Sequence, residues 1–291
     1  MHAAYQIHEA VHRPHRTTRR QDSSYTVRIY FNVITVNDTL KGGNVPQETI
    51  DDQLEILNAA YENAGFTFVA DDAVYTENED WRKIVQRGDN EYAMMSSLRQ
   101  GDYSELNIYI TTIAPEPDGS VTLAYATLPD KASERAFQVD GIVLDANTLP
   151  GVAEPPYNKG ITLVHEAGHW LGLLHTFERG NGTAADDELA GCKGDGDFVQ
   201  DTPAEASAAF GCQIDRDTCT GQLEEDNTTS DPGPDPIHNY MDYGDDECLN
   251  TFTDGQAQRM QTAYLNSRIN YEQGDDDETF DPEPPGPPHG G

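Results

Sequence analysis

The segment from His165 to His175, HEAGHWLGLLH, carries residue types whose spacing suits metal-dependent hydrolysis. His165 and His169 are four residues apart, so on a helix both imidazoles project from one face and can bind the same tetrahedral zinc ion. Glu166 lies beside them and can accept a proton from water that zinc has acidified to a pKa of about 7. One helix is therefore predicted to supply two metal ligands and a general base.

Gly172 and His175 extend this pattern beyond the helix. A glycine can adopt a positive φ, which lets the chain turn sharply at a helix end. Without that turn, His175 would lie about 15 Å along the axis from His165, at a rise of about 1.5 Å per residue. We therefore predict that His175 returns as a third ligand, although HExxH alone also occurs in ordinary amphipathic helices.

The complete pattern HExxHxxGxxH resembles the signature of the metzincin zinc endopeptidases. These proteases have a methionine turn beneath the metal, and the segment HNYMDY at 238–243 is similar to it. The resemblance assigns Met241 to the structural floor of the site. It places Tyr243 next to the zinc ion, as a movable ligand, or next to the oxyanion that forms during the reaction.

Three further segments resemble one metzincin family, the pappalysins, and particularly its small microbial members. They are GDFVQDTP at 196–203, DPIHNYMDY at 235–243 and FTDGQAQRM at 252–260. The resemblance covers about residues 25–268. It implies an α/β metzincin fold in which an N-terminal lobe has a twisted mixed sheet and two long helices. The C-terminal lobe is expected to be irregular, disulfide-linked and closed by a helix.

All four cysteines, Cys192, Cys212, Cys219 and Cys248, follow the histidine segment. An even number in a loop-rich region favours two disulfides and an oxidising compartment. The spacing allows three pairings, and the lack of a CxxC pair makes a second zinc site the weaker alternative. The pappalysin resemblance implies the pairs Cys192–Cys219 and Cys212–Cys248.

The segment KGDGDFVQDTP places several oxygen ligands on a glycine-rich loop. Carboxylates at Asp195, Asp197 and Asp201 suit Ca²⁺, which takes six to eight oxygens at about 2.3–2.6 Å. The pappalysin resemblance carries a calcium role most directly to Asp197 and Thr202. A solvated acidic loop is the alternative.

Hydrophobic patterning predicts the elements that position these residues. β-Branched and aromatic residues at 25–36 and 106–112 predict strands, the second of them buried on both faces. Ile50, Leu54 and Leu57 share one face of a helix that begins near Pro46 and ends at Gly65. Further strands are predicted at 66–69, 122–127 and 141–144, and further helices at 91–98, 159–174 and 253–269. Alternating strands and helices indicate an α/β lobe.

The metzincin resemblance places LAYATLP at 123–129 on the edge strand above the cleft. An extended peptide can add to such an edge through main-chain hydrogen bonds. An internal strand is the alternative. The catalytic domain is predicted to span 23–268, with an upper lobe at 23–175 and a lower lobe at 176–268. Residues 1–22 are expected to form a flexible tail or pro-segment remnant, and 269–291 an acidic, Pro/Gly-rich disordered tail.

The chain has 52 acidic and 18 basic residues and a net charge of −34. Such a charge repels nucleic acid and anionic membranes, so neither is expected as a partner. The acidity favours a salt-loving origin, and calcium-binding carboxylates in a secreted protein are the alternative. No apolar run reaches the length of a membrane helix, and the N-terminus lacks the apolar region of a secretory signal. The cysteines still favour an extracellular protein, which we expect to be a monomer.

Together these features predict a zinc-dependent endopeptidase acting on protein or peptide substrates. Asp246 and Glu247 lie close to where metzincins form the wall of the S1′ pocket, and carboxylates there would favour a basic residue after the cut. Surface carboxylates are the alternative. Two other functions stay open: hydrolysis of a non-peptide amide or ester, and a non-catalytic binding module. In the latter, zinc would have a fourth protein ligand, usually cysteine.

Overall fold

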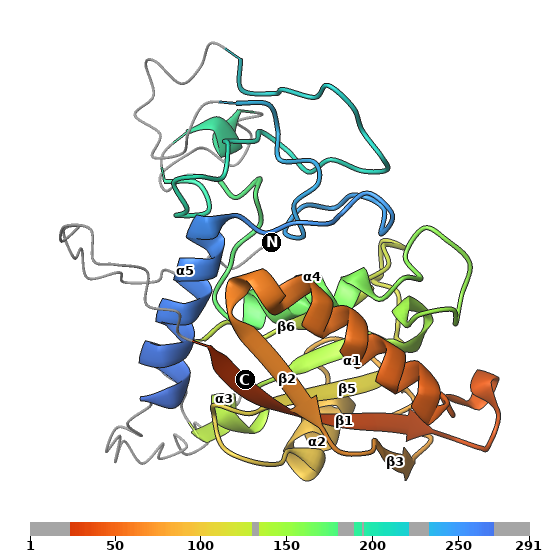
Figure 1. Cartoon of the computed structure of the whole chain (residues 1–291). Coiled ribbons are helices and arrows are strands. Elements are labelled where there is room, and N and C mark those ends of the chain that lie inside the picture. The colour runs from red at the N-terminus through yellow and green to blue at the C-terminus, as the bar shows by residue number, and fades with distance from the viewer. Residues whose placement is uncertain (1–23, 130–133, 180–188, 194, 221–232, 271–291) are drawn as a thin grey trace, which may run out of the picture.

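The computed structural model describes residues 24–129, 134–179, 189–193, 195–220 and 233–270 (Figure 1). The predicted N-terminal tail and nearly all of the predicted C-terminal tail lie outside these ranges and stay predictions. In the described ranges, the helices are too short or too polar to cross a membrane.

A sheet of seven strands forms the first lobe, and the order of its main path is β2-β1-β5-β7-β6. These strands are β1 (Tyr25–Thr35), β2 (Phe66–Ala70), β5 (Leu106–Ile113), β6 (Ala124–Ala126) and β7 (Ile142–Asp145). The pairs β1–β2, β1–β5 and β5–β7 are parallel, whereas β6 is antiparallel to β7. The predicted mixed sheet is confirmed, and β6 lies at its edge rather than inside it.

Two short strands were not predicted. They are β3 (Val74–Glu77), which pairs with β1, and β4 (Lys83–Ile84), which pairs with β5. All of β3 is exposed or only half-buried, so its sequence lacks the apolar alternation of a half-buried strand. A two-residue strand such as β4 is too short for any periodicity. The remaining short elements are η1 (Leu40–Gly42), η2 (Glu62–Ala64), α3 (Glu134–Gln138), η3 (Ala146–Thr148) and η4 (Ala190–Cys192).

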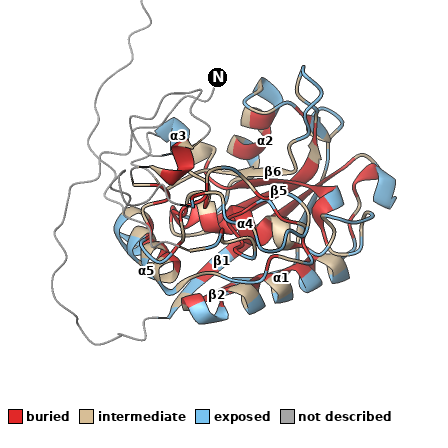
Figure 2. Cartoon of the chain, turned by 90° about the horizontal axis from the view of Figure 1, so that it is seen from above, coloured by how far each residue is buried: buried red, intermediate tan, exposed pale blue. Residues whose placement is uncertain are grey.

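The sheet is covered on both faces. Ile108 and Ile110 of β5 belong to a core shared with helices α1 (Gln47–Tyr61) and α4 (Ile161–Trp170). Tyr109, between them, packs on the opposite face with helix α2 (Asp89–Leu98). Successive side chains of a strand alternate between faces, so this division follows directly from the sequence. Figure 2 shows α1 and α2 on opposite sides of the strands, with buried residues concentrated between them. The prediction that β5 is buried on both faces is confirmed.

Helix α4 lies between the sheet and the second lobe, and it is shorter than the predicted span of 159–174. Gly160 precedes it with a φ of 78°, and Gly172 follows it with a φ of 99°, so the helix is bounded by left-handed residues at both ends. α1 packs beside it, and the hydroxyl of Tyr61 donates a hydrogen bond of 2.8 Å to the carbonyl of Val164. The sheet lobe thereby holds the histidine-bearing helix in a fixed orientation.

The second lobe is irregular, as predicted, and contains the disulfides Cys192–Cys219 and Cys212–Cys248. It ends in α5 (Asp254–Ala263), which continues as the π-helix η5 (Tyr264–Ile269). Thr253 and Gln256 form a complete capping box at the start of α5. Figure 1 shows α5 standing beside the sheet lobe below the irregular segments. The predicted α/β fold with a disulfide-linked second lobe is confirmed.

Candidate active site

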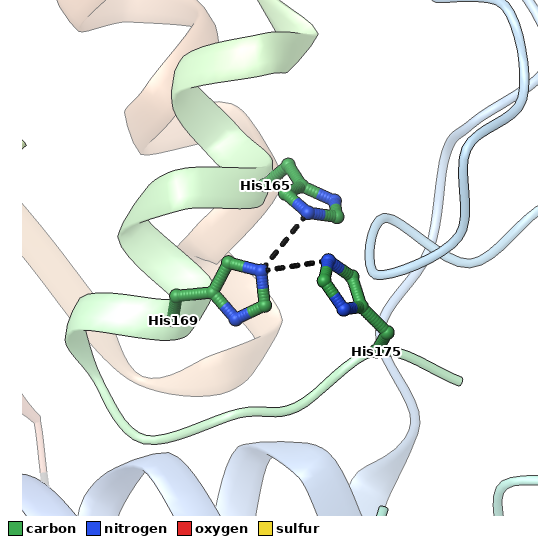
Figure 3. Close-up of side chains that lie close together, drawn as sticks. All are labelled: His165, His169 and His175. Atoms are coloured by element: carbon green, nitrogen blue, oxygen red, sulfur yellow. Dashed lines mark hydrogen bonds between the residues drawn. The ribbon is translucent and has the colours of Figure 1, made fainter. Parts of the chain in front are cut away.

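The three histidines of the HEAGHWLGLLH segment converge on one point (Figure 3). His169 Nε2 lies 3.1 Å from His165 Nε2 and 3.1 Å from His175 Nε2. Two nitrogens bound at about 2.0–2.1 Å to a tetrahedral zinc ion are about 3.3 Å apart. The spacing of the three nitrogens therefore matches a small tetrahedral metal ion.

The Nδ1 atoms of two of these histidines make hydrogen bonds to backbone carbonyls, and these bonds fix the state of the Nε2 atoms. His165 Nδ1 donates to the Tyr240 carbonyl at 2.7 Å, and His169 Nδ1 donates to the Leu173 carbonyl at 2.8 Å. Burial lowers the pKa of His165 to about 3 and that of His169 to about 4, so both rings are neutral. Each Nε2 then carries a lone pair, and the two lone pairs repel at 3.1 Å. A metal ion between them removes this repulsion, so the donor set fits a metal.

Gly172 brings the third histidine back to the helix. Its N–H donates to the His169 carbonyl at 2.8 Å, and the next N–H, of Leu173, donates to the Gly168 carbonyl at 2.9 Å. A Cβ atom on Gly172 would lie 2.7 Å from the Cβ of Ala263, so the position excludes a side chain as well as requiring a positive φ. The predicted turn is present, and it places His175 within ligand distance.

Glu166 is buried on the same helix. Burial raises the pKa of its carboxyl to about 8. A cation at the three histidines would lower that pKa, because a nearby positive charge favours the ionised carboxylate. The carboxylate can then accept a proton, and its buried setting favours holding that proton afterwards.

Met241 and Tyr243 complete the surroundings of the histidines. Met241 is fully buried, and a Cβ atom on Gly168 would lie 2.5 Å from its sulfur, so the thioether packs directly against the helix. The Tyr243 hydroxyl lies 3.0 Å from His175 Nε2. Burial raises the pKa of Tyr243 to about 12, so the hydroxyl keeps its proton and can donate it in a hydrogen bond.

The two residues predicted to set specificity have different surroundings. Asp246 is buried, and its Oδ2 accepts a hydrogen bond of 2.7 Å from the Lys159 N–H just before α4. It therefore caps the active-site helix. Glu247 is exposed, and its carboxylate lies 3.5 Å from Lys159 Nζ.

The four residues predicted to supply oxygen ligands to calcium also differ in burial and in hydrogen bonding. Asp197 and Thr202 are buried side by side, and Asp197 Oδ2 and Thr202 Oγ1 have no hydrogen-bond partner other than each other among the described residues. Burial raises the pKa of Asp197 to about 7, and a bound cation would lower that pKa by favouring the ionised carboxylate. Asp201 instead accepts hydrogen bonds from Thr253 Oγ1 at 2.7 Å and from the Gly255 N–H at 2.8 Å, at the start of α5. Asp195 is only half-buried.

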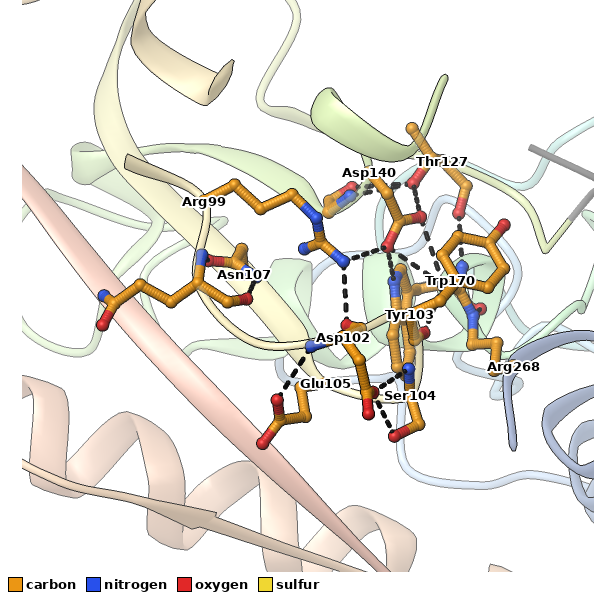
Figure 4. A network of polar contacts seen from close by, with 12 residues as sticks. Arg99, Asp102, Tyr103, Ser104, Glu105, Asn107, Thr127, Asp140, Trp170 and Arg268 are labelled. Carbon is orange, nitrogen blue, oxygen red and sulfur yellow. Dashed lines mark hydrogen bonds and ion pairs between the residues drawn. The ribbon is translucent and has the colours of Figure 1, made fainter. Parts of the chain in front are cut away.

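A buried ion pair at the C-terminal end of α4 had no signal in the sequence (Figure 4). Arg268 lies 3.0 Å from the carboxylate of Asp140, and its Nε donates to the Trp170 carbonyl at 2.8 Å. The guanidinium lies 3.7 Å from the centre of the Trp170 ring. Asp140 also accepts a hydrogen bond of 2.6 Å from Thr127 Oγ1, just after β6. The pair thus joins the edge strand, the active-site helix and η5.

A second unpredicted network holds the residue after His175. Thr176 Oγ1 donates to Glu205 Oε2 at 2.9 Å, and Glu205 is fully buried. Arg216 donates hydrogen bonds to Glu205 and to Asp235, the second at 2.6 Å. The third histidine is therefore anchored to the second lobe rather than to the sheet.

The chain is similar to several known proteins. A model of the peptidase family M43, described as pregnancy-associated plasma protein-A, matches residues 97–265. An extracellular metalloprotease of Colletotrichum graminicola is 39% identical over 249 residues, which cover 85% of this chain and 79% of the relative. One of Pyricularia oryzae is 38% identical, covering 87% of this chain and 79% of the relative. The structure of Tannerella forsythia mature mirolysin in complex with a cleaved peptide has a TM-score of 0.63 at 23% identity. It matches 85% of this chain and 96% of mirolysin, a likeness of fold.

Proposed function

The chain belongs to the pappalysin family of metzincin metalloendopeptidases, and on this premise we propose that it cleaves peptide bonds at a zinc ion held by His165, His169 and His175. The convergence of the three Nε2 atoms is the observation that supports this most directly. Two of these nitrogens carry lone pairs directed at each other, an arrangement that a bound cation stabilises.

Zinc, when bound, acidifies water to a pKa of about 7 and polarises the scissile carbonyl. Glu166 accepts the proton of the attacking water and then donates it to the leaving amine. The Tyr243 hydroxyl donates a hydrogen bond to the developing oxyanion, and its position 3.0 Å from His175 Nε2 supports this role. Met241 is a structural support beneath the histidines.

The substrates we propose are extended segments of proteins or peptides. β6 is the edge strand of the sheet and pairs with β7 on one side. Its other side can pair with a substrate through main-chain hydrogen bonds. A preference for basic residues near the scissile bond would rest on Glu247, because the Asp246 carboxylate already caps α4.

We further propose a structural Ca²⁺ at Asp197 and Thr202, where two buried oxygens have no partner other than each other among the described residues. A rise in melting temperature on adding calcium, absent in Asp197→Asn, would support this site.

The relatives are named extracellular, and two disulfides suit an oxidising compartment, so we propose that the protein is secreted. We keep residues 23–268 as the proposed catalytic domain, and a salt-loving origin remains a proposal that activity across salt concentrations would test.

The decisive test compares the wild type with Glu166→Gln, which keeps the size of the side chain but cannot accept a proton. We expect both proteins to contain one zinc per chain, measured by metal analysis. Cleavage of casein should fall by about 10²–10⁴-fold in the variant, the usual contribution of a general base. Chelator should abolish the wild-type activity. Casein cleavage by the variant at the wild-type rate would rule out the role of Glu166.

A further inference from the structure

Three aromatic side chains form a continuous surface that begins at the third histidine. The Phe177 ring stacks on His175 with centroids 4.7 Å apart and an interplanar angle of 12°. The Tyr243 ring lies 4.9 Å from Phe177 and 5.9 Å from Phe210. Tyr243 also lies against His175, with centroids 4.9 Å apart, so Phe177 and Tyr243 both border the metal position and Phe210 lies next to Tyr243.

Phe210 is unusually exposed for such a large apolar side chain. Its exposed fraction is 61%, and that of Tyr243 is 38%, on a chain with a net charge of −34. Single exposed apolar residues are common, but a group of them at the edge of a reactive site is typical of a binding surface.

The backbone around Phe210 is fixed against the Met241 turn. The Ala209 N–H donates to Asp242 Oδ1 at 3.0 Å, and Gly211 forms a β-bridge with Gly244. The disulfide Cys212–Cys248 closes the same region. Phe210 is thus presented to solvent by a braced segment, which keeps its ring beside Tyr243.

We propose that Phe177, Tyr243 and Phe210, here called the aromatic platform, form a subsite for an apolar substrate side chain close to the scissile bond. An aromatic or leucine-sized side chain would lie across the exposed faces of these rings. Such a contact removes apolar surface from water on both partners and allows offset or edge-to-face ring packing. This inference rests on the proposed function, because it makes the platform part of the same cleft.

The carboxylates considered for basic specificity make different contacts. Asp246 and Glu247 lie next to Lys159, at the N-terminal end of α4. Phe210 is held against the same 244–248 segment, because Gly211 bridges Gly244 and Cys212 is bonded to Cys248. The aromatic rings suit an apolar side chain, whereas the exposed Glu247 would suit a basic one.

The test uses quenched fluorescent peptides that differ at a single position, carrying Phe, Leu, Ala, Arg or Glu at each of the positions flanking the cut. At one position we expect kcat/KM for Phe and Leu to exceed that for Ala by about tenfold or more. Phe210→Ala should remove most of this advantage, mainly through KM, because the platform binds substrate and transition state alike. The Ala peptide should be cleaved at the wild-type rate, and Phe210→Leu should restore part of the preference.

Val85→Ala is the matched control. Val85 is also 61% exposed, but it follows β4, whose Ile84 packs on the α2 face of the sheet, away from α4. Val85→Ala should leave every kcat/KM unchanged.

Equal losses on the Phe and Ala peptides in Phe210→Ala, or a preference for Arg at the position that depends on Phe210, would overturn the platform. If the zinc-loaded wild type cleaves casein but shows no apolar preference, only the platform fails. If it cleaves nothing, the proposed function fails with it.

Discussion

The sheet lobe and the lobe after His175 bury different kinds of side chain. The main core is apolar and is built chiefly from β1, β2, β5, β7, α1 and α4, and the second lobe adds Met241, Leu249, Met260 and Tyr264 to it. The separate apolar cluster of the second lobe is small and comprises Cys192, Ala204 and Cys219. Asp197, Glu205, Asp235 and Asp242 are buried in that lobe as well. Away from the main core, the second lobe is thus held by disulfides, ion pairs and hydrogen bonds.

This difference matters because the site is divided between the lobes. His165, Glu166 and His169 lie on a helix that the sheet lobe buries. His175 is followed by Thr176, which is bound to Glu205, and Tyr243 belongs to the second lobe. Damage to the second lobe should therefore disturb the metal site while the sheet remains folded.

The largest effect is expected where the lobes meet, at Arg268. Arg268→Met would leave the buried Asp140 carboxylate with the more distant Arg99, at 3.9 Å, as its only remaining cation among the described residues, and breaking a buried pair costs up to about 3–5 kcal/mol. The measurement is the free energy of unfolding in urea. The control is Arg28→Met, which removes a surface pair with Asp71 whose side chains are 43% and 90% exposed. That pair should contribute less than about 1 kcal/mol. Equal losses in the two variants would contradict the buried role of Arg268.

The second largest effect is expected from loss of the Cys212–Cys248 disulfide, which should destabilise the second lobe more than the sheet lobe. The bond spans 36 residues, and closing a loop of that size contributes about 3–4 kcal/mol. In Cys212→Ala/Cys248→Ala we expect amide hydrogen exchange to speed up in the second lobe and to stay slow in β1 and β5. Peptide cleavage should fall in parallel with the zinc content. Faster exchange in both lobes together would show that they unfold as one unit.

Sequence patterns predicted those parts of the molecule whose structure depends on residues close together in the chain. The apolar run of β5, the helical face of α1 and the spacing from His165 to His175 are local, so each could be interpreted without knowing the fold. The ends of α4 were predicted too far out: the pattern did not show that Gly160 takes a positive φ, and the helical span was extended past Gly172 although a turn was expected there. The family resemblance, rather than the spacing, supplied the disulfide pairing.

The buried polar networks could not be predicted in this way. Arg268 and Asp140 are 128 residues apart, and no local spacing links them. Asp201 and Asp246 looked like ligands or specificity residues, yet both accept hydrogen bonds at helix N-termini formed by distant segments. Only the tertiary structure decides whether a carboxylate faces a metal, a helix end or solvent.

Measured per pH unit, the smallest effect concerns the protonation of Glu205. Burial raises the pKa of Glu205 to about 8 even though Arg216 lies against it. Its pKa in the unfolded chain is near 4.3, so as pH rises from about 4.3 to 8 the unfolded state releases a proton that the folded state keeps. The free energy of unfolding should therefore fall by up to about 1.4 kcal/mol per pH unit. The stabilisation from protonated Glu205 is complete below the lower pKa and lost above the higher one.

Glu205→Gln cannot titrate but can still bond to Thr176, so its stability should fall less steeply between about pH 5.5 and 7.5. The exposed Glu247→Gln is the control and should follow the wild-type slope. If the Glu205→Gln curve also runs parallel to the wild type, the folded protein holds Glu205 ionised by Arg216, and the second lobe is stabilised by an ion pair at all these pH values.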